Sequence, residues 1–303
     1  MTPSLPVDPT VDGPSPTELL RAVPSKTAFR RVLAAVELDD DVTDEREHAL
    51  ESLSQIELQR AANEVRFAAP QRIYYYRLPD LPHVDASDFE DLVETNSFGP
   101  QLRAVAEQHD RVYIVCSVPD GGTQAQLSIS DESRETTVAT FDPRTTFLAV
   151  RAESRPVADS TVRAISNHPA LDDSHGLSLT ENGFHGRFQD EYVEAYTRLV
   201  LETAGRTITA DRLEITAERH PETGDRRDLR RDNVVGDLLT SGDTVEKHAR
   251  VRLDFPELQD ESDLLTNPRI RLSFEDDSIA FAQFVPERVL ILLDQGIRSC
   301  YPG

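Results

Sequence analysis

One stretch of this sequence, residues 111–165, limits the possible folds more than any other. Residues 112–118 form a nearly unbroken apolar run rich in β-branched side chains, and a Pro-Asp-Gly-Gly cluster at 119–122 follows it, which is typical of a reversing turn. Further strand-like segments follow at close spacing, over residues 125–130, 136–141 and 145–150. The pattern predicts an antiparallel meander that ends in a short helix beginning near Pro156.

The whole chain predicts an α+β fold, in which a small helical N-terminal module precedes antiparallel-sheet α+β units. Residues 1–14 contain four prolines among small polar residues, so we expect a disordered tail there. The helical module is predicted over residues 15–66. A central α+β domain with the meander is predicted over 67–205, and a C-terminal β-rich α+β unit over 206–303.

Local signals place three helices in the N-terminal module. Ser15-Pro16-Thr17-Glu18 combines an N-cap serine, a proline at the first helical position and a capping-box glutamate. Ser25 is expected to cap a second helix, and apolar spacing from Leu50 to Val65 predicts a third that begins after Thr43. This third helix carries more glutamates than arginines, so a DNA-reading helix-turn-helix is less favoured than a packing or protein-docking module.

Residues 73–76 are predicted to form a strand in which Tyr74 and Tyr76 share one face and Tyr75 lies on the other. A base-stacking platform is the alternative role for these rings.

Helical spacing predicts a helix over residues 101–109 and a long helix from Phe188 to Val200, with Gly205 as its stop.

The C-terminal part alternates apolar and polar residues in a way that predicts half-buried strands. The alternation covers residues 213–217, 251–255 and 270–274. Residues 279–285 are expected to pair with 269–274 across the polar turn at 275–278. Pro286 is expected to open a final helix that stops before Gly296.

Charge is the most unusual property of the composition. The formal net charge is −23, and of 32 basic residues only Lys26 and Lys247 are lysines. An acidic, lysine-poor surface suits concentrated salt, so we expect a halophilic archaeal protein, with an acidic protein from a GC-rich genome as the alternative. The chain shows neither a signal-peptide pattern nor an apolar run long enough to cross a bilayer, which predicts a cytoplasmic protein without membrane association.

Two groups of residues are candidate ligand sites. His168, Asp172, His175 and His185, with Asp173 between them, lie within eighteen residues and combine imidazole with carboxylate, as metal sites do. Their spacing matches no compact metal motif, and a solvated loop is the alternative.

The second group is the arginine patch of residues 224–236. If this segment is helical, Arg226 with Arg230 and Arg227 with Arg231 form a guanidinium patch suited to phosphates or carboxylates. The alternative is a salt-bridged surface segment, in which Asp225, Asp228 and Asp232 neutralise the arginines.

Catalytic motifs are missing from the sequence: it contains no phosphate-binding loop, no dinucleotide fingerprint and no nucleophile elbow. We therefore expect a non-enzymatic interaction or adaptor protein that needs no cofactor and whose partners are other proteins. The alternatives are a nucleic-acid-associated or phosphate-binding regulator that uses the arginine patch, and a metal-dependent enzyme at the histidine and aspartate loop.

Overall fold

The computed structural model describes residues 14–38, 46–69, 71–77, 100–119, 134–142, 145, 147–165, 175–180, 184–203, 212–219, 227–241, 244–258 and 265–301. Most of the predicted tail, the predicted strand at 125–130 and Gly205 lie outside these residues. Among the described helices, none is both long enough and apolar enough to cross a membrane.

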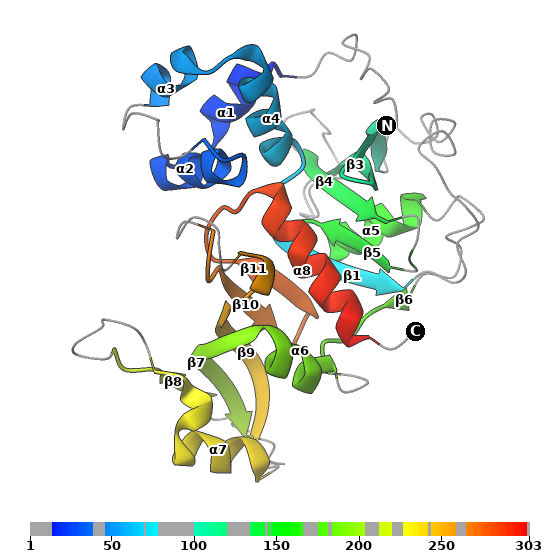
Figure 1. Ribbon diagram of the computed structural model, residues 1–303. Coiled ribbons are helices and arrows are strands. Elements are labelled where there is room, and N and C mark those ends of the chain that lie inside the picture. The colour runs from blue at the N-terminus through cyan, green and yellow to red at the C-terminus, as the bar shows by residue number, and fades with distance from the viewer. Residues whose placement is uncertain are drawn as a thin grey trace.

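A single antiparallel sheet organises the molecule, which confirms the α+β class (Figure 1). Ten described strands lie side by side in the order β2-β3-β4-β5-β1-β11-β10-β9-β7-β8, and the short β6 also pairs with β1. Their bounds in this order are Gln101–Gln108, Arg111–Pro119, Arg134–Phe141, Phe147–Arg151, Arg72–Arg77, Ser278–Phe281, Arg269–Ser273, Thr244–Leu253, Val193–Thr203 and Arg212–Thr216, with β6 at His175–Gly176.

The predicted meander is confirmed in part, because β3, β4 and β5 pair in sequence and helix α5 (Arg155–Ile165) follows them. Strand β3 pairs directly with β4, however, and the strand predicted between them at 125–130 lies outside the described residues. The predicted alternation in β1 is confirmed as well. Tyr74 and Tyr76 pack with α5 on one face of the sheet, whereas Tyr75 packs into the larger core on the other face. All three tyrosine side chains are buried, so they do not form an exposed stacking platform.

The N-terminal module contains four described helices, α1 (Pro16–Ala22), α2 (Lys26–Ala35), α3 (Arg46–Ser52) and α4 (Gln55–Arg66). Ser15 and Glu18 form the predicted capping box, and Ser25 caps α2. The prediction of one helix through residues 50–65 was wrong. Ser54 and Glu57 form a second capping box, which begins a new helix after α3 has ended.

Two other predicted helices were also wrong, because strand pairing prevails over local spacing. Residues 101–108 form β2, which pairs with β3 over most of its length. The segment predicted as one helix from Phe188 is divided: α6 (Phe184–Tyr192) ends at Tyr192, and β7 then pairs with both β8 and β9. Propensity is a weak prior when a neighbouring strand offers backbone partners.

The C-terminal hairpin of β10 and β11 has the predicted pairing. Helix α8 (Glu287–Cys300) follows it but does not stop before Gly296, so this predicted end was wrong. Gly296 lies where α8 crosses close to the Tyr192 ring, and a Cβ atom there would approach the ring carbons to 3.2 Å. This glycine serves close packing rather than helix termination.

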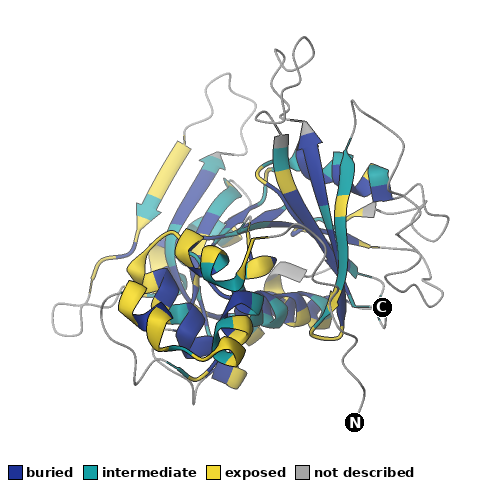
Figure 2. Ribbon diagram, turned by 90° about the horizontal axis from the view of Figure 1, so that it is seen from above, coloured by how far each residue is buried: buried dark blue, intermediate teal, exposed yellow. Residues whose placement is uncertain are grey.

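The two faces of the sheet are covered differently. Helix α8 and its leucines pack on one face, against Ile270, Leu272 and Ile279. Helix α5 covers the other face only over β1 and the meander strands. The predicted boundary at 205–206 lies outside the described residues. Strands β7 and β8, on either side of it in the sequence, are neighbours in one sheet, and the division into two units stays a prediction. Edge strand β8 is largely exposed (Figure 2).

The remaining described elements lie near β7 and β9. They are the 3₁₀ turn η4 (Leu229–Arg231), helix α7 (Asn233–Thr240) and the 3₁₀ turn η5 (Pro256–Leu258). Leu229 and Val235 pack into the same core as α8, so these elements cover the α8 face.

Candidate functional site

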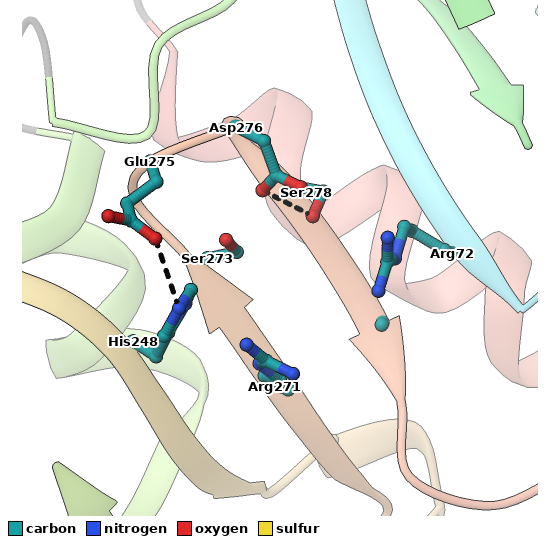
Figure 3. A pocket seen from close by; sticks show the side chains of 8 residues that line it. Arg72, His248, Arg271, Ser273, Glu275, Asp276 and Ser278 are labelled. Atoms are coloured by element: carbon teal, nitrogen blue, oxygen red, sulfur yellow. Dashed lines mark hydrogen bonds and ion pairs between the residues drawn. The ribbon is translucent and has the colours of Figure 1, made fainter. Parts of the chain in front are cut away.

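A polar pocket of about 300 Å³ lies on the sheet face opposite α8, next to the area that α5 covers. Figure 3 shows its side chains in front of β10 and β11, with α8 running behind the strands. Its lining combines two arginines, a histidine, two serines, two acids and an alanine: Arg72, Arg271, His248, Ser273, Ser278, Glu275, Asp276 and Ala280.

Strand register explains why these distant residues meet. Arg72 on β1 is the partner of Ala280 on β11, which in turn is the partner of Arg271 on β10. The next row joins Ser278, Ser273 and His248. Because alternate residues share a face, both rows point away from α8. Small side chains in the middle of the rows form the floor, and long side chains form the walls.

The two acids of the pocket are already engaged by other side chains. The Glu275 carboxylate lies 3.2 Å from His248 Nε2 and 3.6 Å from Lys247 Nζ. Asp276 Oδ1 accepts a hydrogen bond from the Ser278 hydroxyl at 2.8 Å. Burial and the guanidinium of Arg271 lower the pKa of His248, and Glu275 only partly opposes this shift. The imidazole is therefore held mainly neutral at neutral pH.

Arg155 of helix α5 contacts the turn that borders the pocket. Its guanidinium donates to the Asp276 carbonyl at 3.2 Å and lies 5.8 Å from the centre of the Tyr74 ring. Arg72 donates to the Glu153 carbonyl at 2.9 Å, just before α5 begins. These contacts fix the position of Arg72 and the turn at 275–278 relative to the helix.

Two buried polar atoms on this face have no hydrogen-bond partner among the described residues. They are Nδ1 of His248 at the pocket and Nε of Arg198 further along the same face. A buried donor or acceptor without a partner costs stability, so Nδ1 of His248 is a candidate contact for a ligand in the pocket.

The arrangement favours anion binding over catalysis. Guanidinium, imidazole and hydroxyl groups are the donors that hold phosphate or carboxylate groups. His248 uses Nε2 toward Glu275, and neither serine hydroxyl is hydrogen-bonded to its ring within the described part of the chain. The nucleophile and base contact of a serine hydrolase is thus not formed.

The arginines predicted as a patch are placed differently. Residues 229–231 form a 3₁₀ turn and α7 begins at Asn233, so the segment is not one helix. Arg227 and Arg231 are exposed, and Arg226 lies outside the described residues. Arg230 is bound by Asp228 and donates to three backbone carbonyls, those of Gln189, Val193 and Glu194. Its role is structural.

The predicted metal residues lie mostly outside the described residues. This holds for His168, Asp172 and Asp173, and for the side chains of His175 in β6 and His185 in α6. Within the described ranges, no group of three or more histidine, cysteine or acidic side chains is arranged to hold a metal ion.

A second polar cluster lies under α8 and is a structural feature. Arg151 is paired with Glu287 through two short hydrogen bonds, and Arg111 is paired with Asp294 at 2.5 Å. Tyr113 donates to the same Glu287 carboxylate. Arg151 and Glu287 are fully buried, so a ligand from solvent does not reach them.

Sequence reasoning missed the pocket because its residues extend from position 72 to position 280. One local signal was available. The strands RIRLS at 269–273 and HARVRL at 248–253 each carry two arginines two residues apart, on the face away from the apolar residues. A polar face with arginines at adjacent alternate positions indicates a cationic surface.

Comparison with known protein families finds no match to this chain, and a search among curated proteins finds no relative. The arginine-lined pocket is therefore the feature of this chain that indicates a function.

Proposed function

We propose that this protein is a non-catalytic anion-binding protein that holds a phosphate-bearing ligand in the pocket on the open sheet face. The main support for this proposal is that Arg72, Arg271 and His248 lie together around a floor of small side chains. Among the described residues, no carboxylate lies within ion-pair distance of Arg271, so its guanidinium is available to a ligand.

Phosphate suits this pocket because guanidinium groups bind phosphate oxygens through paired, charge-assisted hydrogen bonds. Serine hydroxyls add neutral donors at the floor. The ligand's negative charge would also favour the protonated form of His248, so binding and proton uptake are expected to be coupled. The pocket volume, about 300 Å³, is at the small end of the range for small-molecule sites.

Titration calorimetry with inorganic phosphate at low ionic strength tests the proposal. We expect Arg271→Gln to weaken binding at least about tenfold, because a charge-assisted contact is lost. Ala280→Leu should weaken it by filling the pocket without changing any charge. Arg66→Gln on α4 is the matched control, since Arg66 is exposed in the helical module. Absence of phosphate binding by the parent protein, or equal binding by all variants, would contradict the proposal.

The adaptor role expected from the sequence stays a prediction. The exposed large apolar side chains of the described residues are Ile56, Leu213, Val234 and Val245, which belong to α4, β8, α7 and β9. Apolar residues scattered singly in this way are common on protein surfaces. The geometry therefore favours a ligand pocket over a protein-docking patch.

We also propose, from the composition, that the protein works in the cytoplasm of a halophilic archaeon. The support is the net charge of −23 with two lysines among 32 basic residues. The salt dependence of its stability tests this part, as described in the Discussion.

A further inference from the structure

We propose that the ligand of this site carries two linked phosphate groups, and that Arg250 and Arg269 form a second subsite for the outer one. This inference rests on the proposed function, because the first phosphate occupies the pocket of Arg72 and Arg271. The second subsite lies beside the pocket, on the same face of the sheet.

The register places the second subsite directly next to the first. Arg250 on β9 is the cross-strand partner of Arg271 on β10. Arg269 lies two residues before Arg271 on the same strand, and therefore on the same face. Neighbouring strands are about 5 Å apart. Two phosphates joined through one oxygen are close enough to contact both subsites.

Charge balance on this face singles out the same residues. Arg198 is paired with Glu214 at 2.5 Å, and Arg252 with Glu194 at 2.6 Å. Arg250 and Arg269, in contrast, are exposed and have no carboxylate partner within ion-pair distance among the described residues. The arginines without an ion-pair contact to a described carboxylate thus lie next to the pocket rather than along the whole face.

Like charges placed directly opposite each other destabilise a sheet. Arg271 lies opposite Arg250, and Arg250 lies opposite Arg198 on the far side. Arg269 lies opposite Arg252 in the next row. An anion between these guanidinium groups would turn a repulsive arrangement into a favourable one, which explains why a strongly acidic chain places arginines side by side here.

A compact diphosphate fits this face better than a nucleic-acid strand. Proteins that bind single strands offer aromatic rings on which bases stack. None of the exposed large apolar side chains in the described part of the chain is aromatic. Recognition here is by guanidinium and hydroxyl groups alone, over a width of a few strands.

The test compares phosphate, pyrophosphate and a ten-residue oligothymidylate by calorimetry at one low ionic strength. The parent protein should bind pyrophosphate at least about tenfold more tightly than phosphate. The double variant R250Q/R269Q should lower the affinity for pyrophosphate about tenfold more than the affinity for phosphate. R66Q/R163Q removes two exposed arginines elsewhere and is the matched control. Circular dichroism and urea unfolding check that each variant is folded.

Each outcome decides between the two proposals. The second subsite is overturned if the parent binds phosphate and pyrophosphate with equal affinity. It is also overturned if R250Q/R269Q loses affinity for the two anions equally; in both cases phosphate binding in the pocket stands. Binding of neither anion overturns the proposed function, and the second subsite with it. Tighter binding of the oligonucleotide than of pyrophosphate overturns the diphosphate assignment in favour of a nucleic-acid strand.

Discussion

At the scale of single residues, buried charges determine how α8 is held on the sheet. Burial by itself would raise the pKa of Glu287, but the charge and hydrogen bonds of Arg151 outweigh it, so this pKa lies below its usual range. Tyr113 and Arg111 add to the same effect. The carboxylate at the start of α8 therefore stays ionised and bonded to a neighbouring strand.

Glu287→Gln should destabilise the protein by about 3–5 kcal/mol, because it leaves the guanidinium of Arg151 buried without its counter-charge. Urea unfolding at neutral pH measures this change in the free energy of unfolding. Glu47→Gln is the control, since Glu47 bonds to Arg21 at 2.7 Å on the exposed surface, where an ion pair contributes little. Similar losses in the two variants would contradict the assigned importance of the buried pair.

Glu64 shows the opposite behaviour and gives stability a pH dependence. Burial raises the pKa of this carboxyl group to about 7, while the backbone N–H of Arg288, which it accepts at 2.8 Å, partly opposes the shift. In the unfolded chain the group titrates near its ordinary value of 4.5. Between these values the folded state holds more protons, so this contribution to stability decreases as pH rises from about 4.5 to 7.

Glu64→Gln should remove this decrease, since an amide oxygen still accepts from Arg288 and carries no charge. The free energy of unfolding of the variant, relative to that of the parent, should increase by about 3 kcal/mol between pH 4 and pH 8. Urea midpoints measured across this range test the expectation, with the exposed Glu51→Gln as control. If the free energies of unfolding of variant and parent differ by the same amount over the whole pH range, burial does not raise the pKa of Glu64.

At the scale of elements, the sequence predicts what short-range contacts decide. The capping box of Ser15 with Glu18 acts within four residues, and it is found as predicted. The meander and the hairpin of β10 and β11 also depend on near neighbours. Residues 193–203 have helical spacing but become a strand, because the distant strand β9 satisfies their backbone groups. Residues 101–108 are an exception to this rule, since they also become a strand although their partner β3 begins at Arg111, directly after them.

The candidate site could not be predicted for a related reason. Its rows join β1 with β11, and these strands are separated by about two hundred residues in the sequence. Alternation assigns Arg271 and Arg250 to polar faces, but only the register shows that they are direct partners. Ala280 gives no local signal, although its small side chain leaves room for the pocket.

Gly296 in α8 and Gly236 in α7 should respond in opposite directions to substitution by alanine. A Cβ at Gly296 would lie 3.2 Å from the Tyr192 ring, whose hydroxyl is hydrogen-bonded to Ser299 and so resists displacement. A Cβ at Gly236 in α7 meets no atom within 4 Å. Gly236→Ala should stabilise the protein by about 0.5–1 kcal/mol, whereas Gly296→Ala should destabilise it by about 1–3 kcal/mol.

Thermal and urea unfolding of the two single variants test this expectation. The pair controls for helix propensity, because the same substitution is made within a helix in both cases. A stabilising effect at Gly296 equal to that at Gly236 would mean that the close approach of α8 to α6 places no constraint on this position.

At the scale of the whole molecule, charge is distributed unevenly. The chain has a net charge of −23, yet arginines meet around one pocket on the open sheet face. Repulsion among the acidic side chains opposes the compact folded state. Repulsion among the arginines on the open sheet face opposes the pairing of the strands that carry them. Both forces weaken when salt shortens the range of electrostatic interactions.

Added potassium chloride should therefore stabilise the protein, with most of the effect at low concentration. Screening lengths decrease from about 30 Å at 0.01 M to about 10 Å at 0.1 M and about 3 Å at 1 M. We expect the melting temperature to rise by at least about 5 °C over this range, with most of the rise below about 0.5 M. Sucrose is the control, because it strengthens burial without screening charge.

The shape of this curve distinguishes two explanations for the acidic surface. If screening of repulsion dominates, potassium chloride and potassium bromide act equally at equal ionic strength, and the melting temperature reaches a plateau. A continued rise into molar salt that depends on the anion indicates stronger apolar burial instead. A melting temperature that is already high at 0.01 M salt and does not change would contradict both explanations. It would also remove the support for a halophilic origin, because such a chain gains nothing from a saline cytoplasm.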